Sequence, residues 1–148
     1  MNIDNNSGMD LASGIAAFEG KHFATAMQML SPLAEAGNAE AQYRVAIMQQ
    51  NGLIGSTNLA KAAAWMLAAA NQGHAMAQHG VGFMYLEGEG LEKNPAEAAI
   101  WFQKAADHGL AGSLTTLAMM YEQGLGLPQD DAKAKELGPE LYTVVRLD

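Results

Sequence analysis

The most constraining feature of the sequence is a segment that recurs at a fixed offset of 36 residues. The central copy covers residues 75–110, and a second copy covers residues 39–74. The two copies share Ala41/Ala77, Gln42/Gln78, Val45/Val81, Met48/Met84 and Trp65/Trp101. A further copy begins at residue 111. An internal period of roughly 20 to 50 residues is typical of solenoids and propellers, which are built by stacking one structural unit on the next.

The first half of the central copy predicts a helix over residues 75–87. Val81 and Met84 belong to a series of apolar residues at helical spacing. The glycines Gly88 and Gly90 follow this series, and glycine readily adopts the positive backbone angles that end a helix. We therefore expect the first helix of the repeat to end just before this pair.

The second half of the copy predicts a helix over residues 95–107. Asn94 is a favourable N-cap, and Pro95 suits the first helical position, where its missing N–H costs nothing. Gly109 follows the last apolar residue and suits a left-handed C-cap. Each repeat is thus expected to be a pair of antiparallel helices, with the Trp of the second helix in the core.

The same pattern divides the whole chain into four modules within a single domain, at about 9–38, 39–74, 75–110 and 111–146. These boundaries predict an all-α, right-handed α-solenoid of about four antiparallel helix pairs. Equivalent residues in successive modules should form a continuous core, which includes Met48, Met84 and Met120.

The two terminal modules depart from the pattern. In the first, helices are expected over 9–19 and 22–36, after a polar and frayed segment 1–9. Pro32 inside the second of these helices should kink it or delay its start. In the last module Leu137 replaces the Trp, and Gly138-Pro139 interrupts the second helix, which either restarts at Pro139 or gives way to an irregular tail.

Composition excludes several classes of function. The chain has 148 residues, no cysteine and no apolar run long enough to cross a membrane or act as a secretory signal, so we expect a soluble, cytoplasmic protein. A net charge of −8 argues against nucleic acid or an anionic membrane as a partner. Residues 87–148 hold eleven of the sixteen acidic residues, which form either a solvated face or a docking surface for a basic partner.

The residues of the central copy resemble the Sel-one-like repeat (SLR), a relative of the tetratricopeptide repeat. The resemblance rests on the series Ala75, Ala77, Val81-Gly82, Tyr85, Gly88, Gly90, then Asn94-Pro95, Trp101-Phe102, Lys104-Ala105-Ala106 and Gly109. It implies an α-solenoid that acts as an adaptor or scaffold in protein complexes, with the first helix of each pair lining the concave surface. The cysteine-rich secreted members of the family differ from this chain, which lacks cysteine.

Motifs that could carry chemistry are better explained by structure. Gly80-Val81-Gly82 follows no strand and precedes no Lys-Ser/Thr pair, so a phosphate-binding loop is not expected. His74, His79 and His108 lack the spacing of metal ligands on one helix. We therefore expect no catalytic residues, no cofactor and no metal.

The first helices of the modules are predicted to be apolar on two sides, and the second of these sides is the candidate partner-binding surface. At 100° per residue the second, fifth, ninth and twelfth positions of a module lie opposite its core positions. The residues predicted to bind a protein or peptide partner are Glu40, Tyr43, Ile47, Met76, His79, Phe83, Leu86, Thr115, Met119 and Glu122.

Two explanations of this apolar side stay open. Neighbouring helices or the C-terminal tail could bury it, or it could be an exposed groove with Tyr43, Phe83 and Met119 as anchors. In the second case Glu40 and Glu122 near the rim would select a partner with basic segments.

Three other functions also stay open at this stage. A dedicated inhibitor or immunity-type protein would form a tight one-to-one complex with a toxin or an enzyme. An enzyme or small-molecule binder would need a deep, closed pocket. A structural homo-oligomer would bury its own concave surface, so the oligomeric state is not predicted.

Overall fold

The computed structural model describes residues 3–138, and within this range the chain forms eight helices and no strand. It divides into two compact units, residues 1–77 (unit 1) and 78–148 (unit 2). The helices are α1 (Ile3–Glu19), α2 (Phe23–Glu35), α3 (Ala39–Gln50), α4 (Leu59–Asn71), α5 (Ala75–Glu87), α6 (Pro95–Asp107), α7 (Ala111–Gln123) and α8 (Asp131–Leu137). The single domain expected from the sequence stays a prediction.

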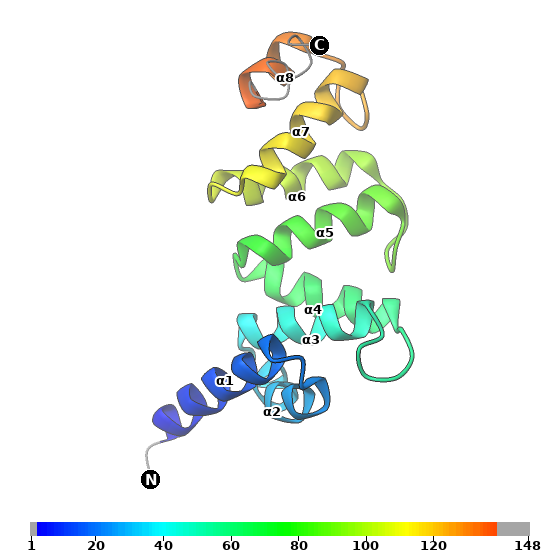
Figure 1. Ribbon diagram of the computed structural model, residues 1–148. Coiled ribbons are helices and arrows are strands. Elements are labelled where there is room, and N and C mark those ends of the chain that lie inside the picture. The colour runs from blue at the N-terminus through cyan, green and yellow to red at the C-terminus, as the bar shows by residue number, and fades with distance from the viewer. Residues whose placement is uncertain (1–2, 139–148) are drawn as a thin grey trace. The chain divides into compact units, whose positions relative to one another are not determined.

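Within each unit, helices that follow one another in the chain pack together. In unit 1, α2 contacts both α1 and α3, and α3 contacts α4; in unit 2, α7 contacts both α6 and α8 (Figure 1). Short connections force this arrangement because they return the chain at once along the helix that it has just left. No helix in the described part of the chain is long and apolar enough to span a membrane.

The helices of the central copy begin and end where the sequence predicts, at 75–87 and 95–107. Their ends are fixed by local chemistry. Asn94 Oδ1 accepts a hydrogen bond from the Glu97 N–H at 3.1 Å, and Gly109 adopts a positive φ of 88° just after α6. The expectation of helix pairs is confirmed in each of the other modules as well.

The structure corrects the expected start of α1 and the delayed start that Pro32 suggested for α2. Helix α1 begins at Ile3 rather than at residue 9, because no proline precedes the apolar stretch and an established helix extends by one hydrogen bond per residue. Helix α2 starts at Phe23 without delay and continues through the exposed Pro32 to Glu35. The sequence alternatives for Pro139 and the tail concern residues outside the described range.

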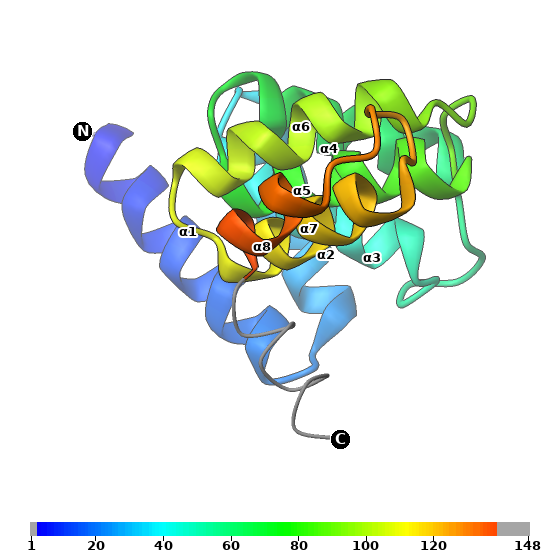
Figure 2. The same cartoon turned by 90° about the horizontal axis from the view of Figure 1, so that it is seen from above.

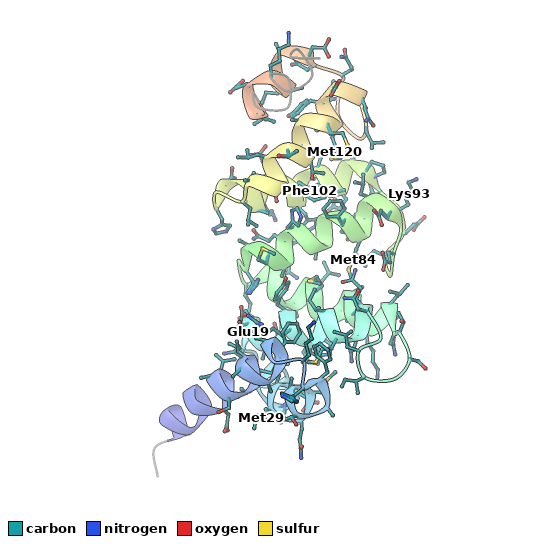
Figure 3. The ribbon with its side chains drawn as sticks, in the orientation of Figure 1. Glu19, Met29, Met84, Lys93, Phe102 and Met120 are labelled. Carbon is teal, nitrogen blue, oxygen red and sulfur yellow. The ribbon has the colours of Figure 1, made fainter. Side chains whose placement is uncertain are left out.

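The core of each unit consists of small and apolar residues at the predicted positions. In unit 1 it contains Ala26, Leu30, Ala34, Ala41, Val45 and Met48, with Trp65 half-buried against them. In unit 2 it contains Ala98, Ala99, Phe102, Ala106, Leu117 and Met120 (Figure 3). Met84 and Trp101 are also buried, as predicted.

Residue sizes compensate at one recurring contact between the two helices of a module. A Cβ atom at Gly82 would lie 2.7 Å from the Phe102 ring, so the aromatic ring occupies the space that glycine leaves. One period later the sizes are reversed, because a Cβ at Gly138 would lie 2.9 Å from the Ala118 Cβ. In each pair a glycine leaves room for the residue opposite, which allows close packing.

The loop between α3 and α4 projects away from the helices in both views (Figures 1 and 2). It carries Ile54, whose exposed fraction is 39%. Ile54 is not among the residues of the unit 1 core or those packed against it.

Candidate functional site

Four of the predicted partner-binding residues line one hollow in unit 1. Glu40, Tyr43 and Ile47 reach it from α3, and Met76 reaches it from the start of α5. The hollow has a volume of about 600 Å³, and its remaining walls are Phe18, Arg44, His74 and Ala75. We call the four predicted residues the unit 1 face. Met76 is 44% exposed, so it is an accessible apolar side chain at the edge of this hollow.

Glu40 is the centre of a charged network on this face. Its Oε1 accepts a hydrogen bond from Arg44 Nε at 2.8 Å, and its Oε2 lies 2.6 Å from His74 Nε2. Arg44 also reaches Glu19 at 3.7 Å and stacks over the Phe18 ring at 4.9 Å (Glu19 is labelled in Figure 3). These contacts hold Arg44 in one orientation, which gives the hollow a defined shape.

His74 connects this network to the first turn of α5. Its Nδ1 accepts a hydrogen bond from the Ala77 N–H at 3.1 Å, so the ring acts as the N-cap of the helix. An accepting Nδ1 leaves the ring proton on Nε2, which donates it to Glu40. The ring also stacks on Tyr43 with centroids 4.7 Å apart.

Two pKa shifts follow from these contacts. Burial alone would raise the pKa of Glu40, but the hydrogen bonds from His74 and Arg44 outweigh it and lower the pKa below its ordinary value. Burial raises the pKa of Tyr43. Glu40 is therefore ionised at neutral pH, and its carboxylate is in contact with both Arg44 and His74.

The equivalent helix face in unit 2 is organised by aromatic packing. The His79 ring contacts Phe83 edge-on at a centroid distance of 4.9 Å and Phe102 at 5.5 Å, and Phe83 contacts Phe102 at 5.0 Å. His79 Nδ1 lies 2.7 Å from the hydroxyl of the fully buried Ser113. Burial lowers the pKa of His79, so the ring is neutral at pH 7.

The remaining predicted residues of unit 2 differ in accessibility. Leu86 is half-buried and packs, like Phe83, against the core of the unit. Met119 is half-buried, whereas Thr115 and Glu122 are exposed. The Thr115 hydroxyl donates to the Ala111 carbonyl at 3.1 Å. We call His79, Phe83, Leu86, Thr115, Met119 and Glu122 the unit 2 face. Three of its residues, His79, Phe83 and Leu86, pack against other side chains of the unit.

Sequence reasoning missed part of the hollow in unit 1. Arg44 and His74 help to complete it, yet neither of them occupies a predicted binding position. The Glu40–Arg44 spacing of four residues on one helix was a usable signal for their ion pair. Nothing in the sequence pairs His74 with Glu40, because that contact joins residues 34 positions apart.

Two observations on the described residues concern metal binding and nucleophilic chemistry. These residues contain no group of three or more His, Asp or Glu side chains that could hold a metal ion. Ser113 has a histidine partner, but its hydroxyl is fully buried and cannot reach a substrate. The arrangement suits recognition of a side chain or a peptide.

Comparisons with known proteins agree with this description. The Sel1 repeat matches residues 39–74, 75–110 and 113–137. A solved Sel1 repeat protein from Oxalobacter formigenes is 30% identical to the chain, with a TM-score of 0.81. A solved protective antigen present in uropathogenic Escherichia coli strains, which displays an SLR fold, is 33% identical, with a TM-score of 0.73. No curated protein matches the sequence.

The two alignments cover most of this chain but less of its relatives. The first covers 86% of this chain and 52% of the Oxalobacter protein, and the second covers 75% of this chain and 24% of the Escherichia coli antigen. The chain thus spans about half the length of the Oxalobacter protein and about a quarter of the length of the Escherichia coli antigen. Together with the helix pairs, these similarities show the all-α solenoid fold that the sequence predicts.

Proposed function

Because the chain belongs to the Sel1 repeat family, whose members are generally non-catalytic scaffolds for protein–protein interaction, we propose that it is an adaptor that binds a protein or peptide partner. The observation that carries this proposal is the hollow of the unit 1 face, with three predicted residues, Tyr43, Ile47 and Met76, as its apolar walls. A side chain of the partner would enter the hollow and bury apolar surface.

The charged network supports this role by fixing the walls in advance. Arg44 is held by Glu40, Glu19 and Phe18, and Tyr43 is held by the stacked His74 ring. A preformed hollow loses less conformational entropy when a partner binds, so more of the contact energy contributes to affinity. In unit 2 the exposed Thr115 and Glu122 are polar groups available to a partner, and the acidic excess after residue 87 would favour basic segments in it.

Selection of peptides from a random library on the immobilised protein tests the proposal, because a random library samples many candidate partner sequences at once. Binding of the selected peptides is then measured by fluorescence anisotropy for wild type, Met76→Glu and Ile54→Glu. Met76 and Ile54 are both exposed in unit 1, by 44% and 39%, but only Met76 lines the hollow. We expect Met76→Glu to weaken binding by about tenfold or more and Ile54→Glu to leave it within about twofold.

Equal effects of the two substitutions would contradict the proposed site. The alternative function is a dedicated inhibitor. The stoichiometry and lifetime of the complex with a natural partner, captured from the source organism, distinguish an inhibitor from an adaptor. A dedicated inhibitor forms a long-lived one-to-one complex, whereas an adaptor exchanges its partners.

A further inference from the structure

A second hollow, in unit 2, involves none of the residues of the unit 2 face. It lies between α6 and α7 and has a volume of about 320 Å³. Helix α6 contributes Ala99, Ile100, Gln103 and Lys104, and Leu117, Tyr121 and Leu127 complete the lining. Ile100 is 51% exposed, more than any other large hydrophobic side chain in the described part of the chain.

Unit 1 contains a related hollow at α2, α3 and α4. Val45 and Gln49 line it at the module positions that Leu117 and Tyr121 occupy in unit 2. Trp65 forms one wall of the hollow in unit 1 and packs against the α2–α3 core. Its counterpart in the last module is Leu137, which packs on the α6–α7 core but is not among the residues that line the hollow in unit 2. Among the residues that the structure describes, Leu137 thus does not supply in unit 2 the wall that the indole ring supplies in unit 1.

The chemistry of the two hollows differs accordingly. In unit 1 the residues around Trp65 include Ser31, Glu35, Gln49 and Lys61, which are suited to contact with water. In unit 2, where the indole is missing, the lining is mainly apolar and open to solvent. Exposed apolar surface of this kind is unfavourable unless a ligand covers it, and it marks interaction sites on proteins.

The charge at the edge of the unit 2 hollow indicates which charged group a ligand would carry beside its apolar part. Among the described residues that line it, Lys104 carries the only charge. Its Nζ lies 4.3 Å from the centroid of the Trp101 ring, which places the ammonium group beside an aromatic surface while leaving the side chain exposed. Gln103 Nε2 donates a hydrogen bond to Asp107 Oδ1 at 2.9 Å.

We propose that the α6–α7 hollow binds an aromatic side chain of a partner protein, with a carboxylate beside it that pairs with Lys104. The aromatic ring would cover Ile100, Leu117 and Leu127, in the place that the Trp65 ring has in the wall of the unit 1 hollow. The proposal rests on protein binding as the function, but the site shares no residue with the unit 1 face, so the two sites can fail their tests independently.

Small probes test the site directly by NMR with ¹³C-labelled methyl groups. N-acetyl-tryptophan supplies the ring and the carboxylate, N-acetyl-tryptophanamide supplies the ring alone, and N-acetyl-leucine is the aliphatic control. We expect N-acetyl-tryptophan to shift the methyl resonances of Ile100, Leu117 and Leu127 saturably, with a Kd of roughly 0.1 to 1 mM. The amide should bind more weakly, and Lys104→Gln should remove the difference between the two.

Three variants make the assignment specific. Leu137→Trp should supply the missing ring from within the chain and weaken binding of N-acetyl-tryptophan at least fivefold. Ile100→Glu should abolish binding, whereas Ile54→Glu, at an exposed isoleucine of unit 1, should not change it. Because Ile100 is exposed, its substitution is not expected to unfold the protein.

Two results would overturn the proposal. The first is the absence of a saturable shift at Ile100, Leu117 and Leu127 in wild type. The second is equal binding of N-acetyl-tryptophan and N-acetyl-leucine, which would show that the hollow does not select an aromatic ring.

Discussion

The two units place different chemistry at the same positions of the repeat. At the fifth and ninth positions of its module, unit 1 has Tyr43 and Ile47 beside the charged network of Glu40, Arg44 and His74. At the same positions unit 2 has His79 and Phe83, which pack against Phe102. The same repeated backbone thus carries a charged network on one face and aromatic packing on the other. The unit 1 face should therefore depend on its charged side chains, and the stability of unit 2 should depend on the volume of its buried side chains.

The largest expected difference between the units concerns stability. Phe102 is fully buried and in contact with Gly82, His79 and Phe83, so Phe102→Ala should reduce the free energy of unfolding by about 3 to 5 kcal/mol. In unit 1, Arg44→Met removes a partly exposed ion pair and should cost about 1 kcal/mol or less. Urea denaturation followed by circular dichroism measures both. Equal costs would contradict the division into a volume-dependent and a charge-dependent face.

The junctions between modules give a second, smaller contrast. Asn38 caps α3 with a hydrogen bond of 2.9 Å to Ala41, and His74 caps α5, but Leu110 before α7 makes no side-chain cap. We expect His74→Ala to destabilise the protein by about 0.5 to 2 kcal/mol, with His74→Asn retaining most of the cap. Leu110→Asn should add a cap and raise the free energy of unfolding by about 0.5 to 1 kcal/mol, as measured by thermal unfolding. A loss there would mean that Leu110 contributes more by packing than a cap can replace.

The two faces should also lose stability in different pH ranges. Burial lowers the pKa of His79 from its ordinary value of 6.5, so below pH 6.5 the unfolded chain binds a proton that the folded unit does not. Stability associated with His79 therefore falls as the pH drops through this range. The pKa of Glu40 is lowered from 4.5, so its contribution is present above pH 4.5 and is lost only at lower pH.

Thermal unfolding between pH 7.5 and 3.5 tests this order. We expect His79→Gln to flatten the profile below pH 6.5 and Glu40→Gln to flatten it below pH 4.5. His22→Gln, which changes an exposed ring, is the control. A profile that His79→Gln leaves unchanged would contradict the role given to burial.

Local signals explain which parts of the fold could be predicted. Asn94, Pro95 and Gly109 act within one helical turn, so the ends of α6 follow from the sequence. The start of α1 could not be predicted, because the residues around it carry no comparable signal for a helix boundary. The repeat itself revealed the core, since equivalent residues recur in each module.

The candidate site depended on contacts that the repeat does not encode. Tyr43, Ile47 and Met76 were found from helical spacing, but the network of Glu40 with Arg44 and His74 depends on how α3 packs against the start of α5. The sequence left two alternatives open for Phe83, an exposed anchor of a groove or a side chain covered by neighbouring helices. The contact of Phe83 with Phe102 exists because Gly82 leaves room for that ring, which spacing alone does not show.

The most direct test of the proposed function is the footprint of a bound peptide on the methionine methyl groups. Met76 and Met29 are both exposed in unit 1, by 44% and 37%, but Met76 lines the hollow and Met29 lies on α2 (Met29 is labelled in Figure 3). In ¹³C-methyl spectra, a peptide from the library selection should shift the Met76 resonance saturably and leave that of Met29 unchanged. Saturable binding that shifts Met29 and not Met76 would contradict the assignment of partner binding to the unit 1 face.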